Sequence, residues 1–147
     1  MSEVTVTSKG NLQNEVNFPN GQTLITDEPK GVGGEDVGPD PYSLLLAALG
    51  SCISMTVTLY ARRKQWPLEQ VIVKLRQNRV HSKDCQECAE NFEGYVHRIE
   101  RTVTLVGDLT DEQRTRLQEI SHKCPVHKTL TSPILIAETK ADAESST

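Results

Sequence analysis

Residues 42–61 read YSLLLAALGSCISMTVTLYA, a stretch of 20 residues without a charged side chain, and the basic run Arg-Arg-Lys at 62–64 follows directly. This length and this basic flank would suit a membrane span. The serines, threonines and glycine in the stretch make it far less apolar than a typical span, and the rest of the chain has the pattern of an ordinary soluble domain. We therefore predict a buried helix in a domain core, which begins at Pro41 and continues to about Gln65.

The composition indicates one domain with a thin hydrophobic core. The chain has 147 residues, a formal net charge of −4 and 36% hydrophobic residues, which is below the usual ~45–50% even when glycine is allowed for in that count. A single domain of roughly 100–200 residues accounts for this length. Because large apolar side chains are few, we expect a second copy of the chain to complete the core. Because acidic residues outnumber basic ones, the chain lacks the excess of positive charge that non-specific nucleic-acid binding requires.

The elements expected on either side of the central helix are strands and one further helix. Alternating apolar and polar residues, with glycine- and proline-rich turns, predict strands within 3–27, 70–80, 94–106 and 130–139. A capping box, TDEQ at 110–113, predicts a helix that continues to Lys123. The order β-β-β-α(α)-β-β-α-β predicts a single α+β domain over residues 1–139, with antiparallel sheets packed on central helices. Residues 140–147 are expected to form a disordered polar tail.

Cys52 and Cys124 are the candidate reactive thiols. A helix break at Gly50-Ser51 would place Cys52 in a first helical turn, where the helix dipole lowers a thiol pKa. Cys124 is predicted at a helix C-terminus, where the dipole disfavours the thiolate. The pair would then be asymmetric, as a nucleophilic and a resolving cysteine are. The alternative for each cysteine is the role of a small buried apolar residue.

His81, Cys85 and Cys88 lie in a polar loop predicted at 81–93 and form a partial zinc set. A closed structural zinc site needs four ligands, often as two CxxC pairs, and the chain has no second pair. The alternatives are a reducible CxxC disulfide and two exposed thiols without a special role.

The first ten residues indicate the cellular compartment, and the compartment in turn sets the redox state expected for the cysteines. Residues Met1–Gly10 contain no apolar stretch behind a basic start, so the sequence shows no secretory signal. We therefore expect a cytoplasmic protein, not bound to a membrane, whose four cysteines are mainly reduced thiols.

Two long segments, each with its cysteine, resemble the OsmC/Ohr family of osmotically inducible and organic-hydroperoxide-resistance proteins. GPDPY at 38–42 and LLLAALGSCISMT at 44–56 are similar to the family's first-cysteine signature. DLT at 108–110 and KCPVHKTL at 123–130 are similar to its second-cysteine region. The resemblance extends over roughly residues 3–138 and keeps the two segments in the family's order.

The resemblance implies an OsmC-like fold, with an intertwined homodimer whose central helices pack at the interface. It also implies thiol-dependent reduction of organic hydroperoxides or hydrogen peroxide, in which Cys52 is the peroxidatic cysteine and Cys124 the resolving one. The product would be a Cys52–Cys124 disulfide, which an external thiol or dithiol reduces, and no cofactor is needed. The alternative is an OsmC-fold dimer that binds a small molecule or a metal without efficient turnover.

The sequence departs from the family pattern in the groups that activate the thiolate. The resemblance implies an arginine from the N-terminal strands and a glutamate about ten residues before the first cysteine, both of which support the thiolate. No arginine precedes Arg62, and the two positions that correspond to the glutamate hold Tyr42 and Ser43. A cation beside the thiolate is what lowers its pKa. The candidate residues that would supply this cation in place of the family's arginine are Lys9, Lys30 and His127.

Overall fold

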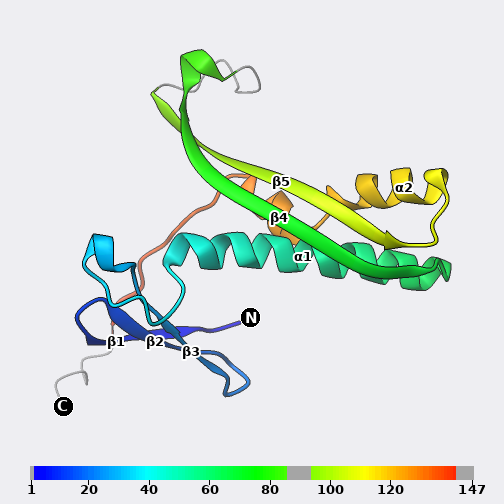
Figure 1. Ribbon diagram of the computed structural model, residues 1–147. Helices are drawn as coiled ribbons and strands as arrows, with labels where there is room; N and C mark the ends of the chain where they lie inside the picture. Colours follow the sequence, from blue (N-terminus) through cyan, green and yellow to red (C-terminus); the bar gives the residue numbers. More distant parts are fainter. Residues whose placement is uncertain (1, 86–93, 142–147) are drawn as a thin grey trace.

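The computed structural model describes residues 2–85 and 94–141, which form an α+β fold with two antiparallel sheets (Figure 1). The small sheet contains β1 (Thr5–Gly10), β2 (Gln13–Asn17) and β3 (Thr23–Thr26), in that order. A long hairpin pairs β4 (Leu68–His81) with β5 (Tyr95–Gly107). The helices are α1 (Pro41–Lys64), α2 (Asp111–Ser121) and α3 (Pro125–Leu130), and the short 3-10 helices are η1 (Lys30–Val32) and η2 (Ser82–Asp84).

The predicted α+β class with antiparallel sheets is confirmed. The helix capping box is also present, because Thr110 Oγ1 accepts from the Gln113 N–H at 3.1 Å and Gln113 Oε1 accepts from the Thr110 N–H at 3.0 Å. The single-domain boundary at 139 and the tail at 140–147 stay predictions, and most of that tail lies outside the described residues.

Helix α1 lies along the β4–β5 hairpin and carries the core (Figure 1). Leu49, Ile53, Val57 and Ala61 follow one another at intervals of four residues, so they share one helix face, and each is buried. This face packs against the hairpin, α2 and α3. Among the described helices, α1 alone has the length and composition of a membrane span, properties that it shares with the core helices of soluble proteins. The predicted buried helix is thus confirmed for this face.

The predicted helix from Pro41 to about Gln65 is continuous, and the alternative of a break at Gly50-Ser51 is wrong. Its N-cap is Asp40, whose carboxylate accepts from the Ser43 N–H at 3.3 Å, and Pro41 occupies the first turn as predicted. Gly50 serves packing instead of ending the helix. A Cβ built there would lie 2.8 Å from Leu75 Cδ1, so the glycine lets α1 approach β4 closely.

The predicted strand at 130–139 is also wrong. Leu130 ends α3, and the described residues from 133 onward form neither helix nor strand. A strand needs a neighbour to satisfy its backbone N–H and C=O groups, and no strand of this chain pairs with the segment in the described part. The segment nevertheless holds Ile134, Leu135 and Ile136, of which the last two are 90% and 91% exposed.

A buried carboxylate organises the loop that leads from β3 to α1. Asp27, only 1% exposed, accepts hydrogen bonds from the backbone N–H groups of Glu28 at 2.8 Å, Glu35 at 3.0 Å and Val37 at 3.3 Å. Burial raises the pKa of this carboxyl, but the three donors outweigh burial and hold it below the ordinary value. The ionised carboxylate therefore stabilises the loop on which the first turn of α1 depends.

We expect Asp27→Asn to lower stability near neutral pH, because the neutral amide accepts more weakly from the three donors. Since the folded pKa lies below the ordinary value of 3.8, the contribution of Asp27 is fully present above that value. It is lost as the pH falls through the folded pKa. The urea midpoints of the wild-type protein and of Asp27→Asn, each at about pH 7 and about pH 3, measure this contribution. The difference in midpoint between the two proteins should be smaller at about pH 3 than at about pH 7. An equal gap at both pH values would contradict the assignment.

Candidate functional site

The structure brings Cys52 and Cys124 together, although 72 positions separate them in the sequence. Cys52 is half-buried on α1, and Cys124 is fully buried between α2 and α3. Both pack in one apolar cluster with Leu49 and Ile53, which we call the cysteine cluster. The Cys52 thiol is close enough to act as a hydrogen-bond partner of the Cys124 thiol, and both cysteines are free thiols.

Neither cysteine has the position relative to a helix end that the sequence suggested. Cys52 lies in the middle of α1 and not in a first helical turn. Cys124 is the N-cap of α3, in the extended conformation expected before Pro125, and its Sγ accepts from the His127 N–H at 3.2 Å. The predicted location at a helix C-terminus was wrong because α2 ends at Ser121 and a further short helix begins at Pro125.

Burial dominates the ionisation of Cys124. It raises the pKa of the thiol, and the adjacent Cys52 thiol raises it further, against the lowering effect of the His127 N–H. A buried thiol without a nearby cation is therefore protonated at neutral pH, and its reactivity depends on which positive charge lies near it.

Arg101 of β5 is the cation that the sequence did not single out. Its guanidinium donates to the Ser121 carbonyl oxygen at 2.9 Å and to Ser121 Oγ at 3.1 Å. Burial lowers the pKa of Arg101, and Coulomb attraction to Cys124 acts in the opposite direction. One signal was available: Arg101 shares the strand face of Ile99 and Val103, both of which pack against the cysteine cluster.

The three residues that the sequence suggested in place of the family's arginine lie on three different elements. Lys9 lies on β1 and forms an ion pair with Glu15 at 3.6 Å, and Lys30 lies in η1. His127 does reach the site, through its backbone N–H to Cys124. Tyr42 and Ser43 occupy the first turn of α1, and the Ser43 hydroxyl donates to Asp40.

A cavity of about 290 Å³ adjoins the cysteine cluster. Leu49, Ile99 and Leu130 belong both to its lining and to the packing around the cysteines. The remaining lining residues are polar or basic: His97, Arg101, His122, His127 and Thr131. Burial and the nearby Arg101 and His127 lower the pKa of His122, which favours the neutral ring. The cavity thus combines an aliphatic wall with a basic one.

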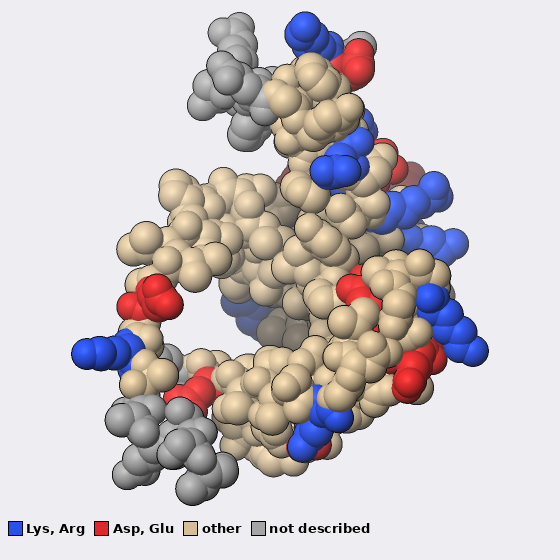
Figure 2. All heavy atoms as spheres, turned by 90° about the vertical axis from the view of Figure 1, so that its left-hand side faces the viewer, with Lys and Arg blue, Asp and Glu red and all other residues tan. Residues whose placement is uncertain are grey.

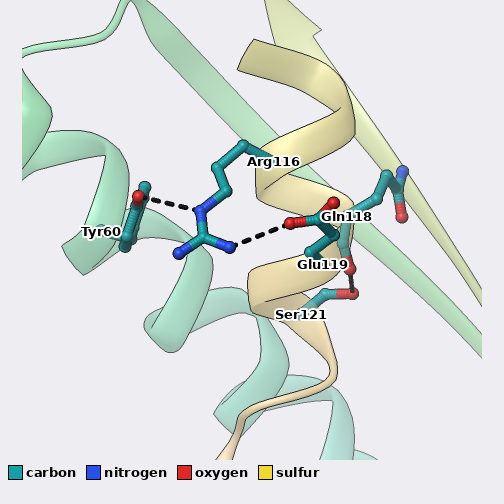
Figure 3. Close-up of polar contacts among 5 residues, drawn as sticks. All are labelled: Tyr60, Arg116, Gln118, Glu119 and Ser121. Atoms are coloured by element: carbon teal, nitrogen blue, oxygen red, sulfur yellow. Dashed lines mark hydrogen bonds and ion pairs between the residues drawn. The ribbon is translucent and has the colours of Figure 1, made fainter. Parts of the chain in front are cut away.

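A polar cluster on the other side of α2 fixes this helix against α1 (Figure 3). Arg116 donates to the Tyr60 hydroxyl at 3.1 Å and pairs with Glu119 at 2.9 Å. The Ser121 hydroxyl donates to the Gln118 carbonyl oxygen within the last turn of α2. The Arg116–Tyr60 hydrogen bond joins α2 to the helix that carries Cys52, and the other two contacts lie within α2.

The partial zinc set does not assemble among the described residues. His81 Nδ1 accepts from the Lys83 N–H at 3.2 Å, and its ring packs edge-on against Tyr95. Cys85 is disulfide-bonded, and Cys88 lies outside the described residues. Residues 2–85 and 94–141 contain no group of three His, Cys, Asp or Glu side chains that could hold a metal ion. A zinc site that includes Cys88 stays a prediction.

An α+β fold with two antiparallel sheets, in which a half-buried and a buried free cysteine share one cluster, defines the class of the protein as a thiol-containing α+β protein. Residues 33–139 match the family described as OsmC-like protein, and the chain belongs to this family. The resemblance seen in the two cysteine segments is thereby confirmed. A search of curated proteins found no matching sequence.

Solved structures of the family share the fold. The OsmC-like protein of Mycoplasma pneumoniae is 17% identical, with a TM-score of 0.67 over 88% of this chain and 86% of that one. An organic hydroperoxide resistance protein OsmC of Legionella pneumophila is 18% identical, with a TM-score of 0.64 over 89% of each chain. OhrB, the organic hydroperoxide resistance protein of Bacillus subtilis, is 16% identical, with a TM-score of 0.60 over 89% and 90%.

Proposed function

We propose that the protein is a thiol-dependent hydroperoxide reductase, in which Cys52 is the peroxidatic cysteine and Cys124 the resolving one. The observation that carries the proposal is the contact between these two free thiols beside a partly apolar cavity. The names of the Legionella and Bacillus structures, both organic hydroperoxide resistance proteins, support the choice of substrate.

The half-buried Cys52 is the thiol that a peroxide reaches first, because Cys124 is fully buried. The Cys52 thiolate attacks one peroxide oxygen, so that an S–O bond forms and the O–O bond breaks. The alkoxide that leaves takes up a proton and becomes the alcohol. The sulfur loses two electrons and becomes a sulfenic acid. The Cys124 thiolate then attacks this sulfur, an S–S bond replaces the S–O bond and water leaves. An external thiol or dithiol, used as co-substrate, reduces the disulfide.

The surface of the chain supports a homodimer. Its accessible area is 11479 Å², roughly half as much again as the ~7,500 Å² of a compact monomer of this mass. Exposed apolar side chains of α1, among them Leu45, Met55 and Leu59, contribute to this excess.

A groove of about 410 Å³ runs between α1 and β4, lined by residues that include Gly50 and Val73. The face in Figure 2 is covered mostly by uncharged residues, with many of its charged side chains toward the margins. A second copy would bury such surfaces.

A reducing compartment belongs to the same proposal. Free thiols at Cys52 and Cys124 persist in the cytoplasm, where glutathione and thioredoxin keep cysteines reduced. The disulfide would then be transient, formed by peroxide and removed by the reductant in each cycle.

Treatment of the reduced protein with one equivalent of cumene hydroperoxide, and separately of hydrogen peroxide, tests the proposed function. We expect a Cys52–Cys124 disulfide in peptide maps by mass spectrometry, and faster formation with cumene hydroperoxide because Leu49, Ile99 and Leu130 line the cavity. If both peroxides leave both thiols unmodified over minutes, the reductase proposal fails. Binding of a small ligand without thiol oxidation would then favour an OsmC-fold binding protein.

A further inference from the structure

Arg101 occupies a position where the pattern of its strand calls for an aliphatic residue. Residues 99, 101, 103 and 105 lie on the same face of β5, and Ile99, Val103 and Leu105 pack in the two core clusters. A guanidinium on such a face loses hydration, a cost that protein partners must offset. Partners within the protein must therefore offset the lost hydration of the Arg101 guanidinium.

Ser121 offsets part of that cost and fixes the guanidinium. Both hydrogen bonds from Arg101 go to this residue, which is itself fully buried at the end of α2. Ile99 and Val103, the neighbours of Arg101 on its strand face, pack in the cluster that contains Cys124, so the two hydrogen bonds to Ser121 hold the positive charge beside that cluster. Arg101 also lines the cavity that adjoins the cysteine cluster.

The other titratable groups around Cys124 are weaker sources of permanent charge. His97 of β5 stacks on Tyr42, and His122 at the end of α2 lies with its ring centroid 6.1 Å from that of His127 on α3. All three histidines line the cavity, and burial together with Arg101 and His127 lowers the pKa of His122, which favours its neutral ring. Cys52 on α1 adds a thiol that repels a neighbouring thiolate when it ionises. Among these groups, Arg101 alone keeps a positive charge throughout the physiological pH range.

We propose that Arg101, held by Ser121, stabilises the thiolate of Cys124 and thereby sets the rate at which the Cys52 sulfenic acid is resolved. The consequence for the rate rests on the proposed function, whereas the effect on the Cys124 charge does not. In the resolving step the Cys124 thiolate forms the S–S bond, and the hydroxide that leaves Cys52 takes up a proton to become water. Arg101 is thus a charge-stabilising residue supplied by β5, in a chain that has no arginine before Arg62.

Titration of Cys124 by the ultraviolet absorbance of its thiolate tests the charge effect directly. The measurement uses the full chain with the other three cysteines replaced by serine, so that only Cys124 contributes. We expect Arg101→Met to shift the titration upward by about one pH unit or more, a tenfold change in ionisation. Arg101→Lys should restore most of the shift, and Ser121→Ala should give a smaller shift because the guanidinium loses one of its anchors.

Arg98→Met is the matched control, because Arg98 lies on the opposite face of the same strand and pairs with Glu100 at 3.4 Å. It removes the same charge and should leave the Cys124 titration unchanged. If Arg101 served only to hold the end of α2, Arg101→Met would lower thermal stability without moving the titration, and this result overturns the proposal. An equal shift in the Arg98 control would also overturn it.

The resolving rate separates this inference from the proposed function. With all cysteines present, Arg101→Met should slow Cys52–Cys124 disulfide formation after a peroxide pulse by about tenfold near neutral pH, with rescue by Arg101→Lys. Disulfide formation that proceeds at the same rate in both proteins supports the reductase and overturns the role of Arg101. A shifted titration with no peroxide reaction supports the charge effect and overturns the reductase.

Discussion

Cys52→Ser is expected to abolish thiol-dependent peroxide turnover, with a loss on the order of 10³-fold or more. The serine hydroxyl is not ionised at neutral pH and does not support the two-electron oxidation to a sulfenic acid. The measurement is the consumption of cumene hydroperoxide with dithiothreitol as reductant. Because Cys52 is half-buried at the edge of the cysteine cluster, the substitution should leave the fold intact, which circular dichroism checks.

Two further variants separate the roles of the cysteines. Cys124→Ser should retain one round of peroxide reduction and accumulate a Cys52 sulfenic acid, which dimedone traps. Cys85→Ser is the control, because Cys85 lies beyond the end of β4 and outside the cysteine cluster. Turnover by Cys52→Ser at more than a tenth of the wild-type rate would contradict the assignment of Cys52.

The double variant Leu135→Asp/Ile136→Asp is expected to dissociate the proposed homodimer. The two side chains are 90% and 91% exposed in the isolated chain. Burial of a Leu or Ile side chain contributes about 1.5–3 kcal/mol, and a symmetric dimer buries each one twice. Removing this contribution and adding charge should weaken association by at least about 10³-fold, because each 1.4 kcal/mol is tenfold. Sedimentation velocity over a range of protein concentrations measures the effect.

Thr139→Asp is the matched control, since it adds a charge to the same exposed segment without removing an apolar side chain. It should leave the sedimentation coefficient unchanged. If the wild-type protein sediments as a monomer at all concentrations, the dimer proposal fails whatever the variants do. If the double variant remains a dimer, the apolar segment is not part of the interface.

Predictions that depended on neighbours in the sequence were confirmed. The Thr110–Gln113 capping box, the start of α1 at Pro41 and the extended backbone of Cys124 before Pro125 are all present. Each rests on the chemistry of a few consecutive residues: a side-chain cap, a fixed φ angle or a steric restriction before proline. The strands also follow local alternation, because side chains of a strand point to opposite faces in turn.

Predictions that depended on distant partners were wrong or missing. Gly50 does not break α1, because its close approach to Leu75 and the rest of the buried helix face outweigh the helix-breaking preference of glycine. The apolar run at 130–139 has the composition of a strand, yet a strand exists only where another strand pairs with it. Arg101 escaped notice because its partner Ser121 lies 20 positions away.

The sequence by itself determined the class of fold, the central helix and the two cysteines, because these follow from local pattern and from the resemblance of two contiguous segments. Only the tertiary structure decided that Cys52 lies in the middle of a helix, that Cys124 caps another, and that the nearby cation comes from β5. The physical reason is that a thiol pKa responds to burial and to charges within a few ångströms, whatever their separation along the chain.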